Sequence, residues 1–162
     1  TVEIANIYND IGHSYQRLGE FDNAINHHKQ ALQIYKNISK PHQQAFTLSH
    51  LGKVYLEAKQ LESSIQSYEE CLQLVTQMNT DLPERIKIME ILKSLDPVYT
   101  ALGKSEQLEQ SIERVCDTLS DYLDTIADNP EFARESIDIL YKGGKFLESL
   151  ERHGPAMHWF GE

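Results

Sequence analysis

The sequence predicts an all-α fold, a solenoid of about four antiparallel helical hairpins that fills residues 1–162 as a single domain. Two observations support this prediction. The first is an internal repeat: residues 5–38 return as residues 45–78 at a constant offset of 40 residues. The second is the spacing of apolar residues, which recur every three or four positions, as on one face of an α-helix. Repeats of this length are typical of solenoids, whose units bury their apolar faces by stacking on one another.

The first unit predicts a helix over about residues 2–18 and a return helix over about residues 21–38. Large residues share one face of the first helix: Tyr8, Ile11, Tyr15 and Leu18. The second helix carries a matching set: Ile25, His28, Leu32 and Tyr35. Gly12 and Ala24 lie between these large residues, and small side chains allow two helix axes to approach closely. Gly19 suits a helix end that needs a positive φ.

The second unit predicts helices over about residues 42–58 and 61–78, and Pro41 is acceptable near the start of the first of them. Cys71 falls on the apolar face of the second helix, and Cys116 falls on the apolar face of a later one. We expect both thiols to be free, buried and reduced, which indicates a cytoplasmic protein.

Two further units are expected in the second half of the chain. Tyr99 and Gly103 indicate a third unit over about residues 89–127, because Tyr99 follows the equivalent tyrosine of the second unit by 44 residues. A degenerate fourth unit is predicted over about residues 130–153. Residues 154–162 are then either a C-terminal cap or a truncated helix.

The first two units resemble tetratricopeptide repeats of the long, 40-residue variety. The resemblance rests on a large residue, Leu/Ile-Gly, Tyr and then Ala–aromatic–Ala at the family spacing, seen here as Tyr8, Ile11, Gly12, Tyr15, Ala24 and Ala31. Three positions depart from the pattern: His28 stands where an aromatic is usual, and Ser64 and Cys71 replace alanines in the second unit. It implies a right-handed superhelix whose first helices line a concave groove for extended peptides or helices. The resemblance therefore implies binding of a protein or peptide partner.

Helical phase proposes which residues face that groove. They are Asn6, Asn9, His13, Gln16, Phe46, Ser49, His50, Lys53, Glu90 and Lys93. Polar residues with one apolar ring among them suit hydrogen bonding to the backbone of an extended ligand. Family members that bind chaperone tails clamp a C-terminal carboxylate with a Lys/Asn set, and His13 and His50 stand at two of its sites here. The resemblance therefore disfavours heat-shock chaperone tails as the ligand.

Charge is unevenly distributed along the chain. The net charge is −10, of which residues 1–80 contribute −2 (6 Lys/Arg, 8 Asp/Glu) and residues 81–162 contribute −8 (9 Lys/Arg, 17 Asp/Glu). Nucleic acid is disfavoured as a partner, since its binding depends on basic contacts, and a basic protein partner is favoured. Seven carboxylates share one stripe of a predicted long helix: Glu106, Glu109, Glu113, Asp117, Asp121, Asp124 and Asp128. This acidic stripe is either a solvated face or a docking strip for a basic segment.

Catalytic and cofactor motifs are not found. The sequence contains no nucleophile elbow, phosphate loop or paired zinc-ligand motif. Seven histidines include the adjacent His27 and His28, which point about 100° apart on a helix, so we expect a packed His28 beside a solvated His27 and no metal site. No cofactor is expected, and no apolar run is long enough to cross a bilayer.

The sequence thus predicts a non-enzymatic protein–protein interaction module with a scaffold or adaptor role. Two alternatives stay open. One is a regulatory sensor domain that binds a signalling peptide and controls an effector domain outside this sequence. The other is an oligomerisation element in which Trp159 and Phe160 pair between copies of the chain to give a homo-oligomer.

Overall fold

A computed structural model places about three-fifths of the chain. The residues it describes are 1–77, 91, 94–104, 106–114, 117 and 141. The chain forms two compact units, Thr1–Met78 (unit 1) and Asn79–Glu162 (unit 2), and each is described by itself. Most of the expected third and fourth repeats and all of residues 154–162 lie outside the described residues. The single-domain organisation therefore stays a prediction.

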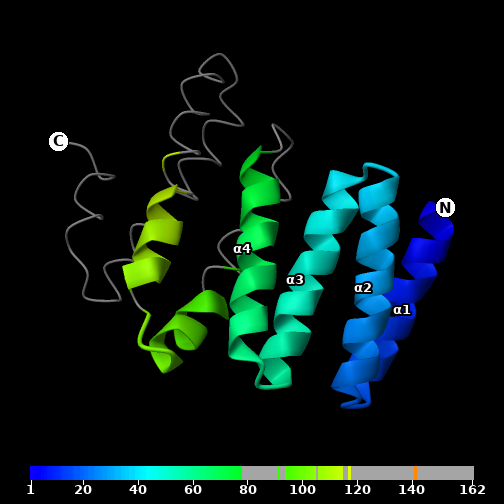
Figure 1. The fold of residues 1–162 in the computed structure, drawn as a ribbon, viewed down its shortest axis with the longest axis horizontal. Helices are drawn as coiled ribbons and strands as arrows, with labels where there is room; N and C mark the ends of the chain where they lie inside the picture. The colour runs from blue at the N-terminus through cyan, green and yellow to red at the C-terminus, as the bar shows by residue number, and fades with distance from the viewer. Residues whose placement is uncertain (78–90, 92–93, 105, 115–116, 118–140, 142–162) are drawn as a thin grey trace. The chain divides into compact units, whose positions relative to one another are not determined.

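Unit 1 consists of four helices, and the predicted all-α fold is confirmed (Figure 1). Their bounds are α1 Val2–Arg17, α2 Phe21–Asn37, α3 Pro41–Glu57 and α4 Leu61–Gln77. The predicted ends differ from these by at most one residue. Pro41 occupies the first turn of α3, as expected. In unit 2, residues 94–101 and 106–114 are helical with a turn between them.

Each described hairpin turn uses a left-handed residue at the same place in the repeat. Gly19 has φ +76°, Lys59 has φ +61° and Gly103 has φ +66°. In the first turn the N–H of Glu20 donates to the carbonyl oxygen of Tyr15 at 3.0 Å, which closes the end of α1. A glycine adopts this conformation without strain, whereas a lysine does so at a cost.

A glycine in each first helix makes room for a ring from the second helix. A Cβ placed on Gly12 would lie 2.8 Å from the imidazole of His28, and one on Gly52 would lie 2.8 Å from the ring of Tyr68. Both distances are too short for real carbon contacts. The predicted close approach of the two helices is therefore confirmed, and the same packing is built twice, 40 residues apart.

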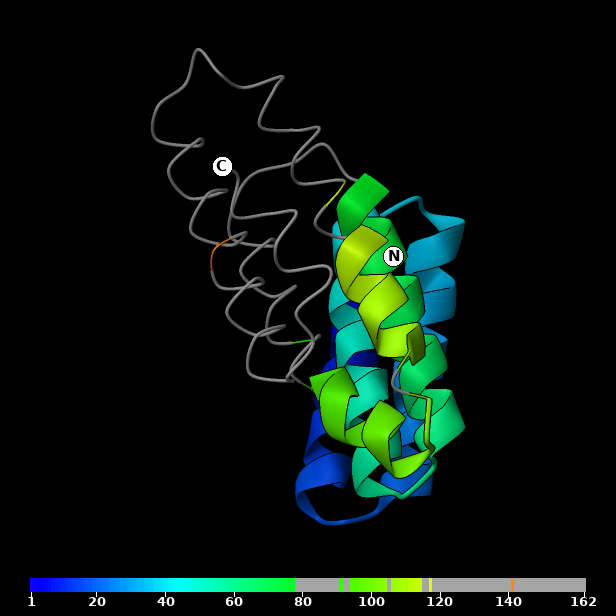
Figure 2. The same ribbon diagram turned by 90° about the vertical axis from the view of Figure 1, so that its left-hand side faces the viewer.

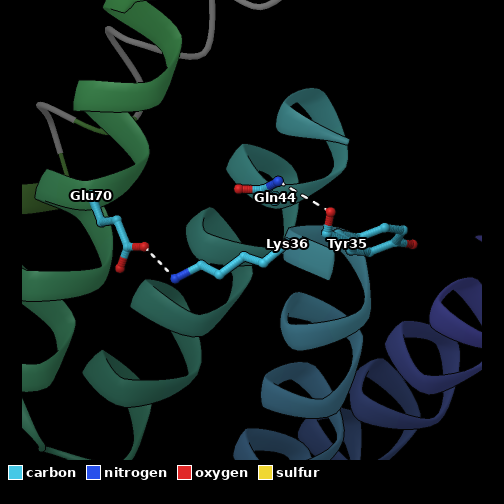
Figure 3. A network of polar contacts seen from close by, with 4 residues as sticks. All are labelled: Tyr35, Lys36, Gln44 and Glu70. Carbon is cyan, nitrogen blue, oxygen red and sulfur yellow. Dashed lines mark hydrogen bonds and ion pairs between the residues drawn. The ribbon is translucent and has the colours of Figure 1, made fainter. Parts of the chain in front are cut away.

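The two hairpins stack with their first helices in one layer and their second helices in another (Figure 2). Figure 3 shows an ion pair between the second helices, α2 and α4, in which Nζ of Lys36 lies 2.7 Å from Oε1 of Glu70. Beside it, the side-chain amide of Gln44 donates to the carbonyl oxygen of Tyr35 at 3.2 Å. Lys36 and Glu70 are about two-fifths exposed, so this ion pair contributes less than about 1 kcal/mol to stability. Apolar packing between the helices therefore contributes more to the stability of unit 1 than this ion pair does.

The core confirms one sequence-based expectation and corrects another. Cys71 is buried, as expected, and its thiol donates to the carbonyl oxygen of Ala45 at 3.0 Å. Leu18 was expected on the buried face of the first helix, but it is 71% exposed because it lies beyond the last turn of α1, where no described residue covers it. Cys116 lies outside the described residues. None of the described helices has the length and apolar character needed to span a bilayer.

Candidate partner-binding site

The first helices of the two hairpins, α1 and α3, are direct neighbours. Nδ2 of Asn9 donates to Oγ1 of Thr47 at 2.9 Å, and Nε2 of Gln16 donates to Oε2 of Glu57 at 3.0 Å. These two bonds join the helices near their middles and near their C-terminal ends. The structure therefore places the first helices of the two repeats side by side, joined by two side-chain hydrogen bonds.

Three rings meet between α1 and α3, and we call them the ring cluster: His13, Phe46 and His50. The ring centroids of His13 and His50 are 4.2 Å apart, and those of Phe46 and His50 are 4.4 Å apart, both edge to face. Phe46 and His13 lie at 6.4 Å. Phe46 is 42% exposed and the two histidines are half-buried. The ring cluster is thus a partly exposed aromatic surface built from two repeats.

Beneath the ring cluster lies His28 of α2, which is completely buried. Its ring centroid is 4.9 Å from that of His13 and 6.0 Å from that of His50. Its Nδ1 lies 2.9 Å from Oδ1 of Asn9, and Asn9 in turn reaches Thr47. Thr47 donates to the carbonyl oxygen of Gln43 at 2.8 Å. We call His28, Asn9 and Thr47 the buried network; it joins α1, α2 and α3.

The buried network fixes the proton on His28. The hydroxyl hydrogen of Thr47 is used on Gln43, so Thr47 accepts a hydrogen bond from the amide nitrogen of Asn9. The amide oxygen of Asn9 must therefore face His28, whose Nδ1 carries the hydrogen. The other ring nitrogen, Nε2, is buried without a hydrogen-bond partner and packs against Gly12.

Protonation of His28 is strongly disfavoured by this surrounding. Burial, assisted by the neighbouring His13 and His27, lowers the pKa of His28 from its usual value near 6.5 to about 4. Burial also lowers the pKa of His13, an effect that Asp10 and Gln16 oppose and Lys53 assists. Both imidazoles are therefore neutral at pH 7.

Two expectations about side-chain placement are corrected. Asn9 was expected on the groove, but it is 5% exposed and both ends of its amide are bonded within the fold. His27 was expected to be solvated, but it is half-buried, with its ring centroid 5.4 Å from that of Tyr15 and 5.8 Å from that of Tyr8. In both cases a neighbouring element supplies a partner that helical phase alone does not reveal.

The remaining groove residues are placed as follows. Asn6 is exposed and its side-chain oxygen accepts the hydroxyl of Tyr35 at 2.6 Å. Ser49 donates to the carbonyl oxygen of Phe46 at 2.7 Å, so its hydroxyl is used within α3. Lys53 is exposed on α3. Glu90 and Lys93 lie outside the described residues.

The acidic stripe is described in part. Glu106 and Asp117 are exposed, and Glu109 and Glu113 are half-buried. The other three members lie outside the described residues: Asp121, Asp124 and Asp128. Four carboxylates at helical spacing are thus found on residues that the structure places in unit 2, and their role as a docking strip stays a prediction.

One part of the site, Thr47, could not have been found by seeking exposed polar residues. Thr47 is polar but completely buried, and it lies between the apolar residues of α3. The signal in the sequence is a polar residue at a position whose helical spacing matches the apolar residues. Asn9 on α1 is a second example. Within the described residues, no three His, Cys, Asp or Glu side chains are grouped to hold a metal ion. What the arrangement offers is ring faces and hydrogen-bonding groups.

Comparisons with known proteins agree with this geometry. Residues 3–77 match the family model described as Tetratricopeptide repeat. Human outer dynein arm-docking complex subunit 4 is 26% identical over 113 residues, which are 68% of this chain and 16% of that protein. The crystal structure of MamA protein superposes with a TM-score of 0.55 and 19% identity, covering 99% of this chain and 90% of that one, a likeness in fold. Residues 3–77 of this chain therefore form tetratricopeptide repeats.

Proposed function

We propose that unit 1 binds a peptide or partner helix across α1 and α3, with the ring cluster at the centre of the contact. The observation that supports this most is the continuity of the ring cluster, since His13 comes from one repeat and Phe46 and His50 from the next. A ligand lying across both first helices would touch all three rings. Such a surface exists only when the repeats are stacked.

The chemistry of the site indicates the kind of ligand. Ring faces and edges attract aromatic side chains, methionine and arginine. Gln16 and Lys53 lie near His13 and supply polar groups that can bond to a peptide backbone. His13 is neutral at pH 7, so it requires no acidic ligand. A tetratricopeptide-repeat scaffold with such a site acts by presenting a surface, and we propose no catalysis.

The wider role that we propose is that of a scaffold or adaptor. The human relative is named as a subunit of a docking complex, which supports an assembly role for this chain as well. The exposed carboxylates Glu106 and Asp117 support a basic partner for the acidic stripe. The buried thiol of Cys71 suits a reducing compartment, which supports a cytoplasmic location.

A capture experiment tests the proposal. The 162-residue chain is immobilised and compared with a groove variant, Phe46→Ala/His50→Ala, for proteins retained from a cytosolic lysate. The matched control is Asn26→Ala/Gln33→Ala, which changes two exposed residues of α2. We expect a partner that is retained by the parent and the control but lost by the groove variant, with equal melting temperatures. Equal retention by all three would contradict the groove, and the next surface to test would be the acidic stripe with Glu106→Lys/Asp117→Lys.

A further inference from the structure

The face of α1 that lies away from α3 is apolar and open. We call it the outer face of α1: Ile7, Ile11, Ser14 and Leu18. Ile7 is 57% exposed and Leu18 is 71% exposed, and Ile4, one turn before Ile7, is 48% exposed. These residues, with Asp10 and Tyr15, line an open hollow of about 440 Å³. Large aliphatic side chains clustered in this way indicate a contact surface.

The internal repeat shows what such a face does. The 40-residue offset pairs Ile7 with Thr47, Ile11 with Leu51 and Ser14 with Val54. On α3 these counterparts are buried: Thr47 is 0% exposed, Leu51 is 2% and Val54 is 0%.

The counterparts on α3 are covered by α2. Leu51 and Val54 form one apolar cluster with Ala24 and Ile25 of α2, against which Phe21 and Leu32 also pack. Only residues 38–40 separate α2 from α3, so the two helices run antiparallel (Figure 1). The same face on α1 carries a comparable apolar surface, and within the described part of the chain no helix covers it.

We propose that the outer face of α1 is a docking surface for an amphipathic helix of the α2 type, packed antiparallel to α1. The helix belongs to a hairpin of the same repeat kind. It presents a small residue and a branched aliphatic at its centre, as Ala24 and Ile25 do on α2. This surface is separate from the ring cluster and does not depend on the groove.

Differences between α1 and α3 define the occupant further. Ser14 stands on α1 where α3 has Val54, and the smaller side chain creates part of the hollow. The occupant therefore carries a larger side chain at that level than α2 does. Ile7 replaces Thr47, so the residue that faces it from the first helix of the docking hairpin is apolar, because an asparagine like Asn9 of α1 would have no partner there. Asp10 replaces His50 and lies on the rim of the hollow, which favours a cationic residue opposite it.

The test places an α2 helix on this face. An extra copy of residues 1–40 is joined ahead of the complete 162-residue chain, so that its last helix meets Thr1 as α2 meets Pro41. We expect one cooperative unfolding transition with a midpoint raised by about 5 °C over the parent chain. Methyl NMR should show the methyl groups of Ile7 and Ile11 in contact with Ala24 and Ile25 of the added copy. An added hairpin that unfolds separately, without shifting the midpoint or the methyl signals, would overturn the proposal.

Two controls separate docking from other causes. In the parent chain Ile7→Glu and Gln33→Glu change exposed positions and should leave the midpoint nearly unchanged. In the extended chain Ile7→Glu should cancel the gain, whereas Gln33→Glu should keep it. Sedimentation of the parent at increasing concentration tests the occupant. If the parent chain is a monomer, the result supports a helix of another hairpin as the occupant of the outer face of α1. A dimer that Ile7→Glu abolishes would overturn that assignment in favour of a second copy of this chain.

Discussion

The imidazole of His28 donates its Nδ1 hydrogen to the side-chain oxygen of Asn9 at 2.9 Å, across the interface between the two helices of the first hairpin. His28 is fully buried and its Nε2 has no hydrogen-bond partner among the described residues. A neutral histidine therefore occupies the place that Tyr68 occupies in the second repeat. The hairpin holds a titratable group in a position where charge is not tolerated.

The first prediction concerns pH. The pKa of His28 is near 6.5 in the unfolded chain and about 4 in the folded one. Between these values the unfolded chain binds more protons, so the free energy of unfolding rises with pH. The contribution of His28 is complete above about pH 6.5 and is lost as the pH falls to 4. We expect a loss of roughly 3 kcal/mol from this residue, measured by urea unfolding at several pH values.

A variant with the residue of the second repeat provides the control for that prediction. His28→Tyr removes the titratable group and copies the Gly52–Tyr68 contact. The slope of stability against pH between 4 and 6.5 should become shallower in this variant. A slope that persists unchanged would show that His28 is not its source.

The second prediction concerns Gly12. An alanine there would bring its Cβ to 2.8 Å from the ring of His28, so the ring or the helix must move. We expect Gly12→Ala to lower the free energy of unfolding by roughly 1–3 kcal/mol, as overpacked core substitutions do. The same change in a His28→Ala background should cost much less. Equal costs in the two backgrounds would mean that the clash is absent.

The third prediction concerns the buried network. Thr47→Val keeps the shape of the side chain but removes the oxygen that accepts from Asn9. The buried amide of Asn9 then has an unsatisfied donor, which we expect to cost roughly 1–3 kcal/mol. Thr47→Ser is the control, because it keeps the hydroxyl group and removes only the methyl group. Chemical denaturation of both variants distinguishes the two effects, and a Thr47→Val protein as stable as the parent would contradict the network.

The fourth prediction concerns the second hairpin turn. Lys59 has φ +61°, where Gly19 of the first repeat has φ +76°. Lys59→Gly removes the strain of a left-handed lysine. The larger conformational entropy of glycine in the unfolded chain opposes this gain. We expect a net gain of roughly 0.5–1 kcal/mol, seen as a higher urea midpoint. Gly19→Ala, the reverse change in the first turn, should destabilise; a destabilising Lys59→Gly would contradict the repeat equivalence.

The helices of unit 1 could be predicted from sequence because their signals are local. Gly19 marks one helix end, Pro41 marks one helix start, and the 40-residue offset checks each assignment twice. The position of Gly12 opposite a large residue could also be predicted, because each repeat contains the same pair. Local pattern and periodicity together determined the hairpins.

The site could be predicted less well, because its contacts join different helices. Helical phase placed Asn9 near the groove, but its burial depends on Thr47 and His28, which come from two other helices. The contact between His13 and His50 depends on how closely α1 and α3 stack, a distance that no single helix encodes. Leu18 was assigned to the core because periodicity cannot show that the helix ends before it.

The most direct test of the central claim is a hydroxyl-radical footprint of the complex with the captured partner. Phe46, which is 42% exposed, reports on the ring cluster, and the exposed Leu18 reports on the outer face of α1. We expect the oxidation rate of Phe46 to fall severalfold when the partner is bound, while that of Leu18 is unchanged. An unchanged rate at Phe46 in a saturated complex would contradict a binding site across α1 and α3.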